Sequence, residues 1–168
     1  MRTLRQPGPA LLPRMIAAEA RCAGRMRVVL PAGAELFAGA IAALAGRPAA
    51  IALIGGGFAA LQYMTGQPDH SGRRVATYGE PTPLAGAITL VSGNAMLGRG
   101  ADGAPAMHCH AVVVAADGSV HGGHLVPGAC PAGRQGLTLV ATLLDGAAFA
   151  VAEDSETNYA LLQPSVTA

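Results

Sequence analysis

One helical segment stands within a long series of short apolar runs, and this pattern limits the folds open to the chain. Residues 34–45 place apolar side chains at helical spacing, and Gly46 with Pro48 just beyond it ends the segment. The other apolar runs are short, are bounded by turn residues and predict strands at residues 26–30, 49–54, 58–64, 87–91, 95–97, 107–115, 120–126, 137–144 and 148–152. The last two strands are expected to pair with each other, and residues 66–74 are expected to form a polar loop. One helix followed by many short strands predicts an α+β fold with a mixed, largely antiparallel sheet.

The length and the composition predict one compact domain that hides part of its surface in an oligomer. A chain of 168 residues is long enough for one core, and 51% hydrophobic against 12% charged residues argues against disorder. The 36 alanines and 23 glycines let backbones pack closely. The apolar excess on so short a chain favours self-association.

Three features predict a cytoplasmic protein without a membrane span. The three cysteines are an odd number without a CxxC pair, as expected in a reducing compartment. Prolines and charges near the N-terminus interrupt any signal-peptide core. Residues 48–68 are uncharged and about membrane length, but Gly55–Gly57 divides them, and we interpret them as two strands around a turn.

Positive charge is concentrated at the N-terminus. Residues 1–27 hold six arginines and one acid, whereas the remainder holds five arginines and nine acids. We therefore divide the chain into a basic arm (residues 1–25), with a short helical stretch around residues 14–21, and a domain (residues 26–168). A solvated or intersubunit segment is the favoured interpretation of the arm, and a nucleic-acid contact is the alternative. The candidate contacts are Arg2, Arg5, Arg14 and Arg21.

Four of the five histidines lie within 17 residues: His108, His110, His121 and His124. Residues two apart in a strand share a face, so His108 and His110 project side by side while Cys109 points the other way. Two imidazoles on one face begin a metal site, and a third ligand must come from the next strand.

The turn around Asp117-Gly118 decides which histidine that is. A two-residue turn places His121 on the histidine face and turns His124 away. A three-residue loop with Gly118 in the left-handed conformation, or a bulge at residues 122–123, places His124 across from His110 instead. We predict the set His108, His110 and His124.

Three neutral imidazoles suit a divalent transition metal, with zinc as the first expectation and one ion per chain. Three protein ligands leave a fourth position for water or a substrate, so the site could be catalytic. A structural site, or histidines that only bond backbone carbonyls, are the alternatives. No general base is evident near the histidines in the sequence.

The stretch GAPAMHCHAVVVAADGSVHGGHL resembles the signature of the plant and prokaryote conserved (PPC) domain, with an HxH strand, a DG turn and a GGHL segment. The likeness covers about residues 26–152. Three earlier stretches resemble the same domain: VVLPAGAELFAGAIAALA, AAIALIGGGFAAL and GAITLVSGNAML.

The resemblance implies a homotrimer of α+β domains with a metal bound by His108, His110 and His124. His121 corresponds to no ligand of that family. Plant members carry AT-hooks that enter DNA, but Gly46-Arg47-Pro48 lacks the first arginine of such a hook and is not accepted as one. Members of the family usually carry an acidic residue before the strand that ends in Leu-Ser-Gly, and this chain has Gly86-Ala87 at that place. The subunit interfaces of the plant members are therefore not carried over to this chain.

Asp154, Glu156 and Asn158 form a polar group near the C-terminus. We expect an exposed polar tail there, with a supporting shell for a metal site as the alternative. The leading hypothesis is a trimeric, metal-binding protein that could associate with DNA. The alternative function is a metal-dependent enzyme that acts on a small molecule at the three histidines.

Overall fold

The computed structural model describes residues 5–14 and 16–167. Within them, one helix, α1 (Leu36–Ala43), accompanies the strands. The strands are β1 (Arg21–Leu30), β2 (Ala49–Met64), β3 (Gly66–Pro68), β4 (Ala76–Tyr78), β5 (Thr82–Arg99), β6 (Pro105–Val114), β7 (Val120–Leu125), β8 (Ala132–Asp145), β9 (Ala147–Asp154) and β10 (Tyr159–Val166).

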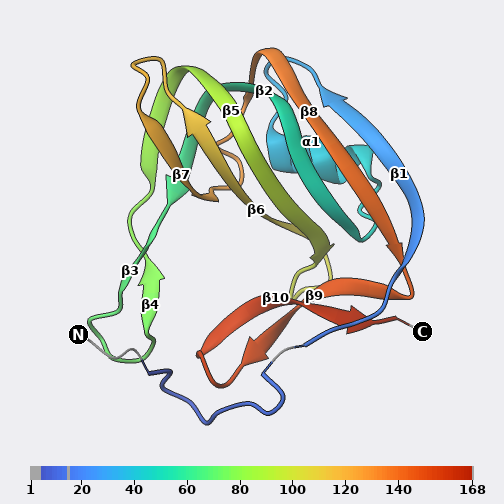
Figure 1. Ribbon diagram of the computed structural model, residues 1–168, viewed down its shortest axis with the longest axis vertical. Helices are drawn as coiled ribbons and strands as arrows, with labels where there is room; N and C mark the ends of the chain where they lie inside the picture. Colours follow the sequence, from blue (N-terminus) through green and yellow to red (C-terminus); the bar gives the residue numbers. More distant parts are fainter. Residues whose placement is uncertain (1–4, 15, 168) are drawn as a thin grey trace.

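Eight strands form one sheet in the order β1-β8-β2-β7-β6-β5-β9-β10, and β2 also pairs with β5 (Figure 1). Strands β5, β6 and β7 follow one another, and both β5 and β7 pair with β2, so these four strands close into a ring. The pairings are antiparallel except for a parallel contact between Arg99 of β5 and Ala150 of β9. The α+β expectation with a mixed, largely antiparallel sheet is confirmed.

Helix α1 lies behind the sheet and closes the core (Figure 1). Leu36, Ala40 and Leu44 recur at helical spacing, and all three are fully buried. The carboxylate of Glu35 begins the helix by accepting a hydrogen bond from the amide of Ala38 at 2.8 Å. The rest of the core consists mainly of leucine, isoleucine, valine, phenylalanine and alanine side chains, with Met107, Cys109 and Cys130 among them.

Several strands are longer than the sequence predicts. The expected turn at Gly55–Gly57 is wrong, because β2 runs unbroken from Ala49 to Met64 with bulges near the glycines. A Cβ on Gly56 would collide with the backbone of Gly136, and one on Gly57 with the backbone of Ile88. These glycines therefore permit close strand approach instead of a chain reversal.

Two further pairings differ from the expectation. Residues 87–91 and 95–97 belong to one strand, β5, because the segment between them bulges without leaving the sheet. Strands β8 and β9 do not pair with each other as a final hairpin. Strand β8 lies between β1 and β2, whereas β9 pairs with β10.

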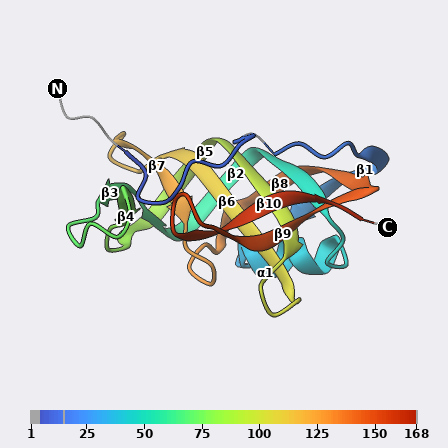
Figure 2. The same ribbon diagram turned by 90° about the horizontal axis from the view of Figure 1, so that it is seen from below.

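The N-terminal segment contains no helix around residues 14–21 within its described part, so that expectation is wrong. The segment runs extended beside the turn between β9 and β10 (Figure 2). There the amide of Gly8 donates to the carbonyl of Glu156, and the amide of Leu11 donates to the Glu156 carboxylate, both at 3.0 Å. These bonds to a distant turn replace the internal bonds of a helix.

Of the helical residues described, none belongs to a helix long and apolar enough to cross a membrane.

Candidate metal centre

The register of the β6–β7 hairpin places His124 directly opposite His110. The amide of Ala115 donates to the carbonyl of Ser119, and the amide of Gly118 donates to the carbonyl of Ala115, both at 2.9 Å. Gly118 has a φ of 84°, so the connection is the three-residue loop with a left-handed glycine. Of the registers left open by the sequence, this one is confirmed.

This register brings three imidazoles together. His108, His110 and His124 each offer a ring nitrogen, and these nitrogens lie within 4.8 Å of one another. The ring centroids are 4.8 Å apart for His108 and His110, 4.5 Å for His108 and His124, and 5.5 Å for His110 and His124. The Zn–N distance is about 2.0–2.1 Å, so two nitrogens bound to one zinc ion cannot be further apart than twice that distance. Small side-chain movements would bring the three nitrogens close enough to bind one ion.

Burial keeps two of these imidazoles neutral. Burial lowers the pKa of His124, and together with the smaller effects of the nearby His108 and His110 it brings this pKa to about 4. Burial and the neighbouring His110 also lower the pKa of His108. A neutral imidazole is the form that binds a metal, so both are ready to bind one at neutral pH.

The Nδ1 atom of His124 is buried and has no hydrogen-bond partner. Buried polar side-chain atoms are normally paired, because an unmade hydrogen bond costs about 1–3 kcal/mol. A metal ion would satisfy such a nitrogen. The residues present therefore fit a metal, in donor type and in this unpaired atom.

His121 is oriented away from this cluster by its own partners. Its Nδ1 lies 2.9 Å from the hydroxyl of Tyr63, and its Nε2 lies 2.7 Å from the hydroxyl of Ser119. Ser119 in turn donates to the carboxylate of Asp117. Both ring nitrogens of His121 are thus engaged, which accords with its exclusion from the predicted ligand set.

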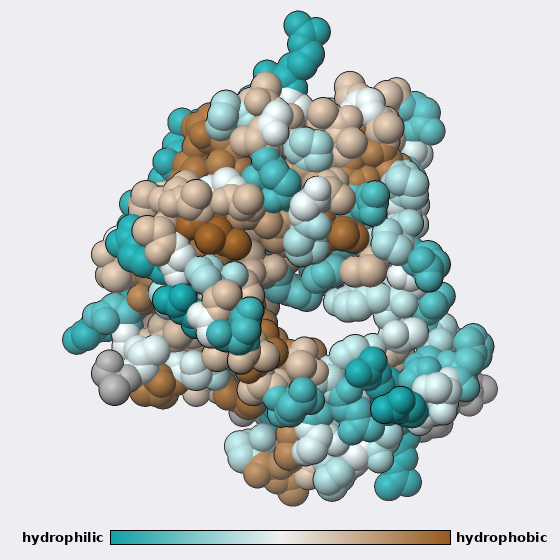
Figure 3. All heavy atoms as spheres, turned by 180° about the vertical axis from the view of Figure 1, so that it is seen from behind, coloured by the Kyte–Doolittle hydropathy of each residue, from teal (hydrophilic) through white to brown (hydrophobic). Residues whose placement is uncertain are grey.

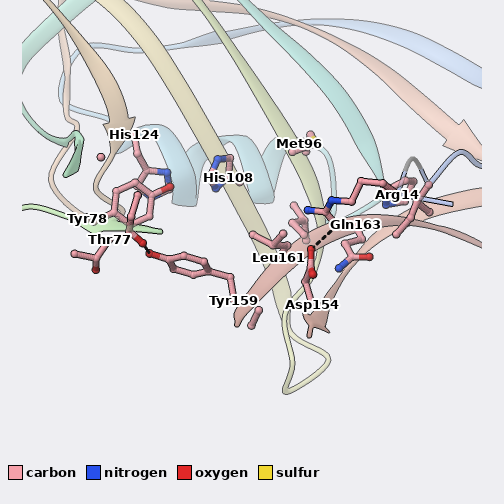
Figure 4. Close-up of a pocket in the computed structure, with 16 residues that line it drawn as sticks. Arg14, Thr77, Tyr78, Met96, His108, His124, Asp154, Tyr159, Leu161 and Gln163 are labelled. Atoms are coloured by element: carbon pink, nitrogen blue, oxygen red, sulfur yellow. Dashed lines mark hydrogen bonds and ion pairs between the residues drawn. The ribbon is translucent and has the colours of Figure 1, made fainter. Parts of the chain in front are cut away.

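A cavity of about 720 Å³ opens beside the histidines. Figure 4 shows His108 and His124 on its wall, with the ring of Tyr78 against that of His124 at a centroid distance of 4.9 Å. Leu161 and Met96 lie between the histidines and the opposite end (Figure 4). The space-filling view shows a hollow between the body of the sheet and the β9–β10 hairpin (Figure 3).

The far end of the cavity carries an ion pair. Arg14 Nη1 donates to Asp154 Oδ2 at 2.8 Å (Figure 4). Arg14 Nε also lies 3.5 Å from Glu156 Oε2. The hydrogen bond from Arg14 lowers the pKa of Asp154. The side chain of Asp154 is only 2% exposed, so the expectation of an exposed tail is wrong at this residue.

The predicted polar group is divided between two roles. Asp154 lines the cavity, but neither it nor Glu156 or Asn158 makes a hydrogen bond to the three histidines. Asn158 adopts the left-handed conformation, with a φ of 58°, and its amide donates to the carbonyl of Arg73 at 2.9 Å. It therefore ties the turn after β9 to the loop that connects β3 and β4.

The predicted arginine contacts also have different surroundings. Arg2 lies outside the described residues. Arg5 is exposed, whereas Arg14 is paired with Asp154 and Glu156. Arg21 pairs with Asp145 at 2.7 Å and already belongs to β1.

Sequence reasoning missed Tyr78, Tyr159 and Met96 as cavity residues. Residues 66–74 were expected to form a polar loop, but the chain forms the β3–β4 hairpin around that loop, which carries Tyr78 to the histidines. The hydroxyl of Tyr159 donates to the carbonyl of Ala76, and the Arg74 guanidinium lies 4.2 Å from the Tyr159 ring centroid. No local spacing links these segments, so no sequence pattern could have revealed them.

A family model described as the Plants and Prokaryotes Conserved (PCC) domain matches residues 18–143. No curated protein matches the chain.

Solved structures share the fold. A metal-containing protein from Archaeoglobus fulgidus aligns with a TM-score of 0.72 and 21% identity, over 89% of this chain and 99% of that one. A plant- and prokaryote-conserved protein from Pyrococcus horikoshii aligns with a TM-score of 0.64 and 22% identity, over 89% and 97% of the two chains. A protein from Ralstonia eutropha, whose name proposes DNA binding, aligns with a TM-score of 0.61 and 16% identity, over 82% and 89%.

Proposed function

The chain belongs to the plants and prokaryotes conserved domain family, and on this premise we propose that it is a metal-binding protein. His108, His110 and His124 would hold one divalent ion per chain, and zinc is the expected metal. The observation that carries the proposal is the meeting of these three imidazoles across one hairpin, with the buried Nδ1 of His124 unpaired.

The chemistry of the ligands supports zinc. Three neutral nitrogen donors without a carboxylate or thiolate suit zinc and other late first-row metals. Bound zinc acts as a Lewis acid and lowers the pKa of a coordinated water. The chain contributes the three imidazoles, of which His108 and His124 are half-buried and would shield the ion from part of the solvent.

We further propose that the chain assembles as a homotrimer. Large apolar side chains are exposed on five strands of the sheet: Val29, Ile54, Val91, Val112 and Val120. Exposed apolar surface of this kind is typical of a subunit interface. A sedimentation experiment that finds only a monomer at micromolar concentration would contradict this part of the proposal.

The second candidate function is that of a metal-dependent enzyme, and the cavity beside the histidines favours it. Three protein ligands leave a position for a reacting group. Asp154 lines the same cavity, but its carboxylate is paired with Arg14 and makes no hydrogen bond to the three imidazoles.

A DNA-associated role is supported by exposed arginines. Arg5, Arg25 and Arg27 are exposed along the N-terminal segment and β1. Association through such charges would weaken steeply with salt and disappear when residues 1–25 are deleted. Binding that does not respond to salt would contradict this role.

The free thiols of Cys22, Cys109 and Cys130 accord with the cytoplasm as the compartment.

The test of the metal site is elemental analysis of protein purified without an affinity tag, alongside the His110→Ala variant. We expect about one zinc ion per chain in the native protein and a loss of most of it in the variant. Equal, negligible metal in both proteins, even after incubation with zinc, would contradict the proposal.

A further inference from the structure

We infer that the cavity beside the three histidines is a binding site for a small organic carboxylate with an apolar body. The inference rests on the proposed metal site. The carboxylate would take the coordination position that three histidines leave open, and the apolar body would lie along β10. Cavities of 300–1,000 Å³ are typical of small-molecule sites, and this one has about 720 Å³.

The charges around the cavity favour an anion. Its lining includes one full positive charge, on Arg14, and one full negative charge, on Asp154, and these two are held as a pair. A divalent ion on three neutral imidazoles would therefore have no compensating charge among the lining residues, and a carboxylate supplies one.

The shape and polarity of the walls favour an apolar body. Leu161, Leu162 and Pro164 of β10 line one side, and Met96 of β5 lines another. Leu161 is 36% exposed even though it is large and apolar, so a ligand could cover it. In Figure 4, Leu161 lies between the histidines and the Arg14–Asp154 pair, in the path of a ligand that extends from the metal.

Three segments that are distant in sequence hold this site together. The N-terminal segment supplies Arg14, the β3–β4 hairpin supplies Tyr78, and the β9–β10 hairpin supplies Asp154 and Leu161. The contacts of Asn158 with Arg73 and of Tyr159 with Ala76 join the second and third segments. These contacts fix the position of the two hairpins that form walls of the cavity.

The test titrates hexanoate into the zinc-loaded protein and follows the binding by calorimetry. Hexanol and hexylamine have the same number of carbon atoms without the negative charge, and metal-free protein lacks the positive charge of the ion. A cobalt(II)-loaded sample reports contact with the metal, because its visible spectrum changes when the open position is filled. We expect saturable binding of hexanoate only to the metal-loaded protein, with a change in the cobalt spectrum.

Variants of β10 locate the ligand. Leu161→Asp places a negative charge on the cavity wall and is expected to weaken hexanoate binding by about tenfold or more. Leu161→Lys removes the same apolar contact but adds a positive charge, so it should bind hexanoate at least tenfold more tightly than Leu161→Asp does. Val166→Asp is the matched control, since Val166 lies on the same strand, is 77% exposed and does not line the cavity.

The outcomes separate this inference from the metal site. Metal-loaded protein that does not bind hexanoate, or that binds hexanol equally well, overturns the carboxylate site while the metal site stands. Equal binding by the Leu161→Asp and Val166→Asp variants overturns the proposed location. A protein that takes up no metal overturns the proposed function, and the inference with it.

Discussion

His124 of β7 lies directly opposite His110 of β6, and its buried Nδ1 has no hydrogen-bond partner. This relationship depends on the three-residue loop at Gly118, because a two-residue turn would have turned His124 to the other face of the hairpin. One residue in a loop thus determines whether a third imidazole joins His108 and His110.

The two histidines of β7 should differ in their effect on metal affinity. The His124→Ala variant loses one of three ligands and is expected to bind zinc more than about 100-fold more weakly, measured by competition with a chelator. The His121→Ala variant is the matched control, because His121 bonds to Tyr63 and Ser119 instead. An equal loss of affinity in both variants would show that the hairpin, not the ligand, is responsible.

The metal-free protein should lose stability as the pH falls from about 6.5 to about 4. The unfolded chain binds a proton at His124 with the ordinary pKa of about 6.5, whereas the folded chain does so only at about 4. The unfolded state therefore binds more protons in this window, and acid favours it. His108 acts in the same direction, since burial lowers its pKa as well.

Urea unfolding at several pH values measures this dependence. The His124→Gln variant should have a flatter profile between pH 6.5 and 4. The carboxylate of Asp154 has a lowered pKa, so its contribution is lost only below about pH 3.8 and does not disturb the window. A variant profile as steep as that of the native protein would exclude His124 as the cause.

Two neighbouring glycines of β2 should respond differently to alanine. A Cβ on Gly57 would collide with the backbone of Ile88 in β5, so Gly57→Ala is expected to destabilise the fold by more than about 2 kcal/mol. A Cβ on Gly55 meets open space, and Gly55→Ala should change the free energy of unfolding by less than about 1 kcal/mol. Thermal unfolding of both variants tests the difference, and similar melting temperatures would contradict it.

Only one of the three cysteines should react with a thiol reagent in the folded protein. Cys22 is exposed, whereas burial raises the pKa of Cys109 to about 12 and that of Cys130 to about 11. The thiolate is the reactive form, so the two buried thiols should label only after unfolding. Mass spectrometry of the labelled protein counts the modified residues, and the Cys22→Ser variant should then show almost no labelling under native conditions.

Local patterns in the sequence predicted the parts of the fold that depend on neighbouring residues. The helix at residues 34–45 was predicted from its spacing and its stop signal, and it forms as α1 (Leu36–Ala43). The shared face of His108 and His110 follows from strand alternation alone. The position of His124 followed only as one of several loop geometries, because Asp117-Gly118 fits both a two-residue and a three-residue turn.

The sequence by itself determined the class of fold and the histidines able to meet, because strand alternation, helix spacing and turn chemistry act over a few residues. The tertiary structure alone decided that β2 runs through its glycines, that Asp154 is buried against Arg14, and that Tyr78 reaches His124. Tyr78 and His124 are 46 positions apart in the sequence, and Arg14 and Asp154 are 140 positions apart. The course of β2 depends on the strands that pair with it. Such contacts arise from packing in three dimensions, which no short-range pattern records.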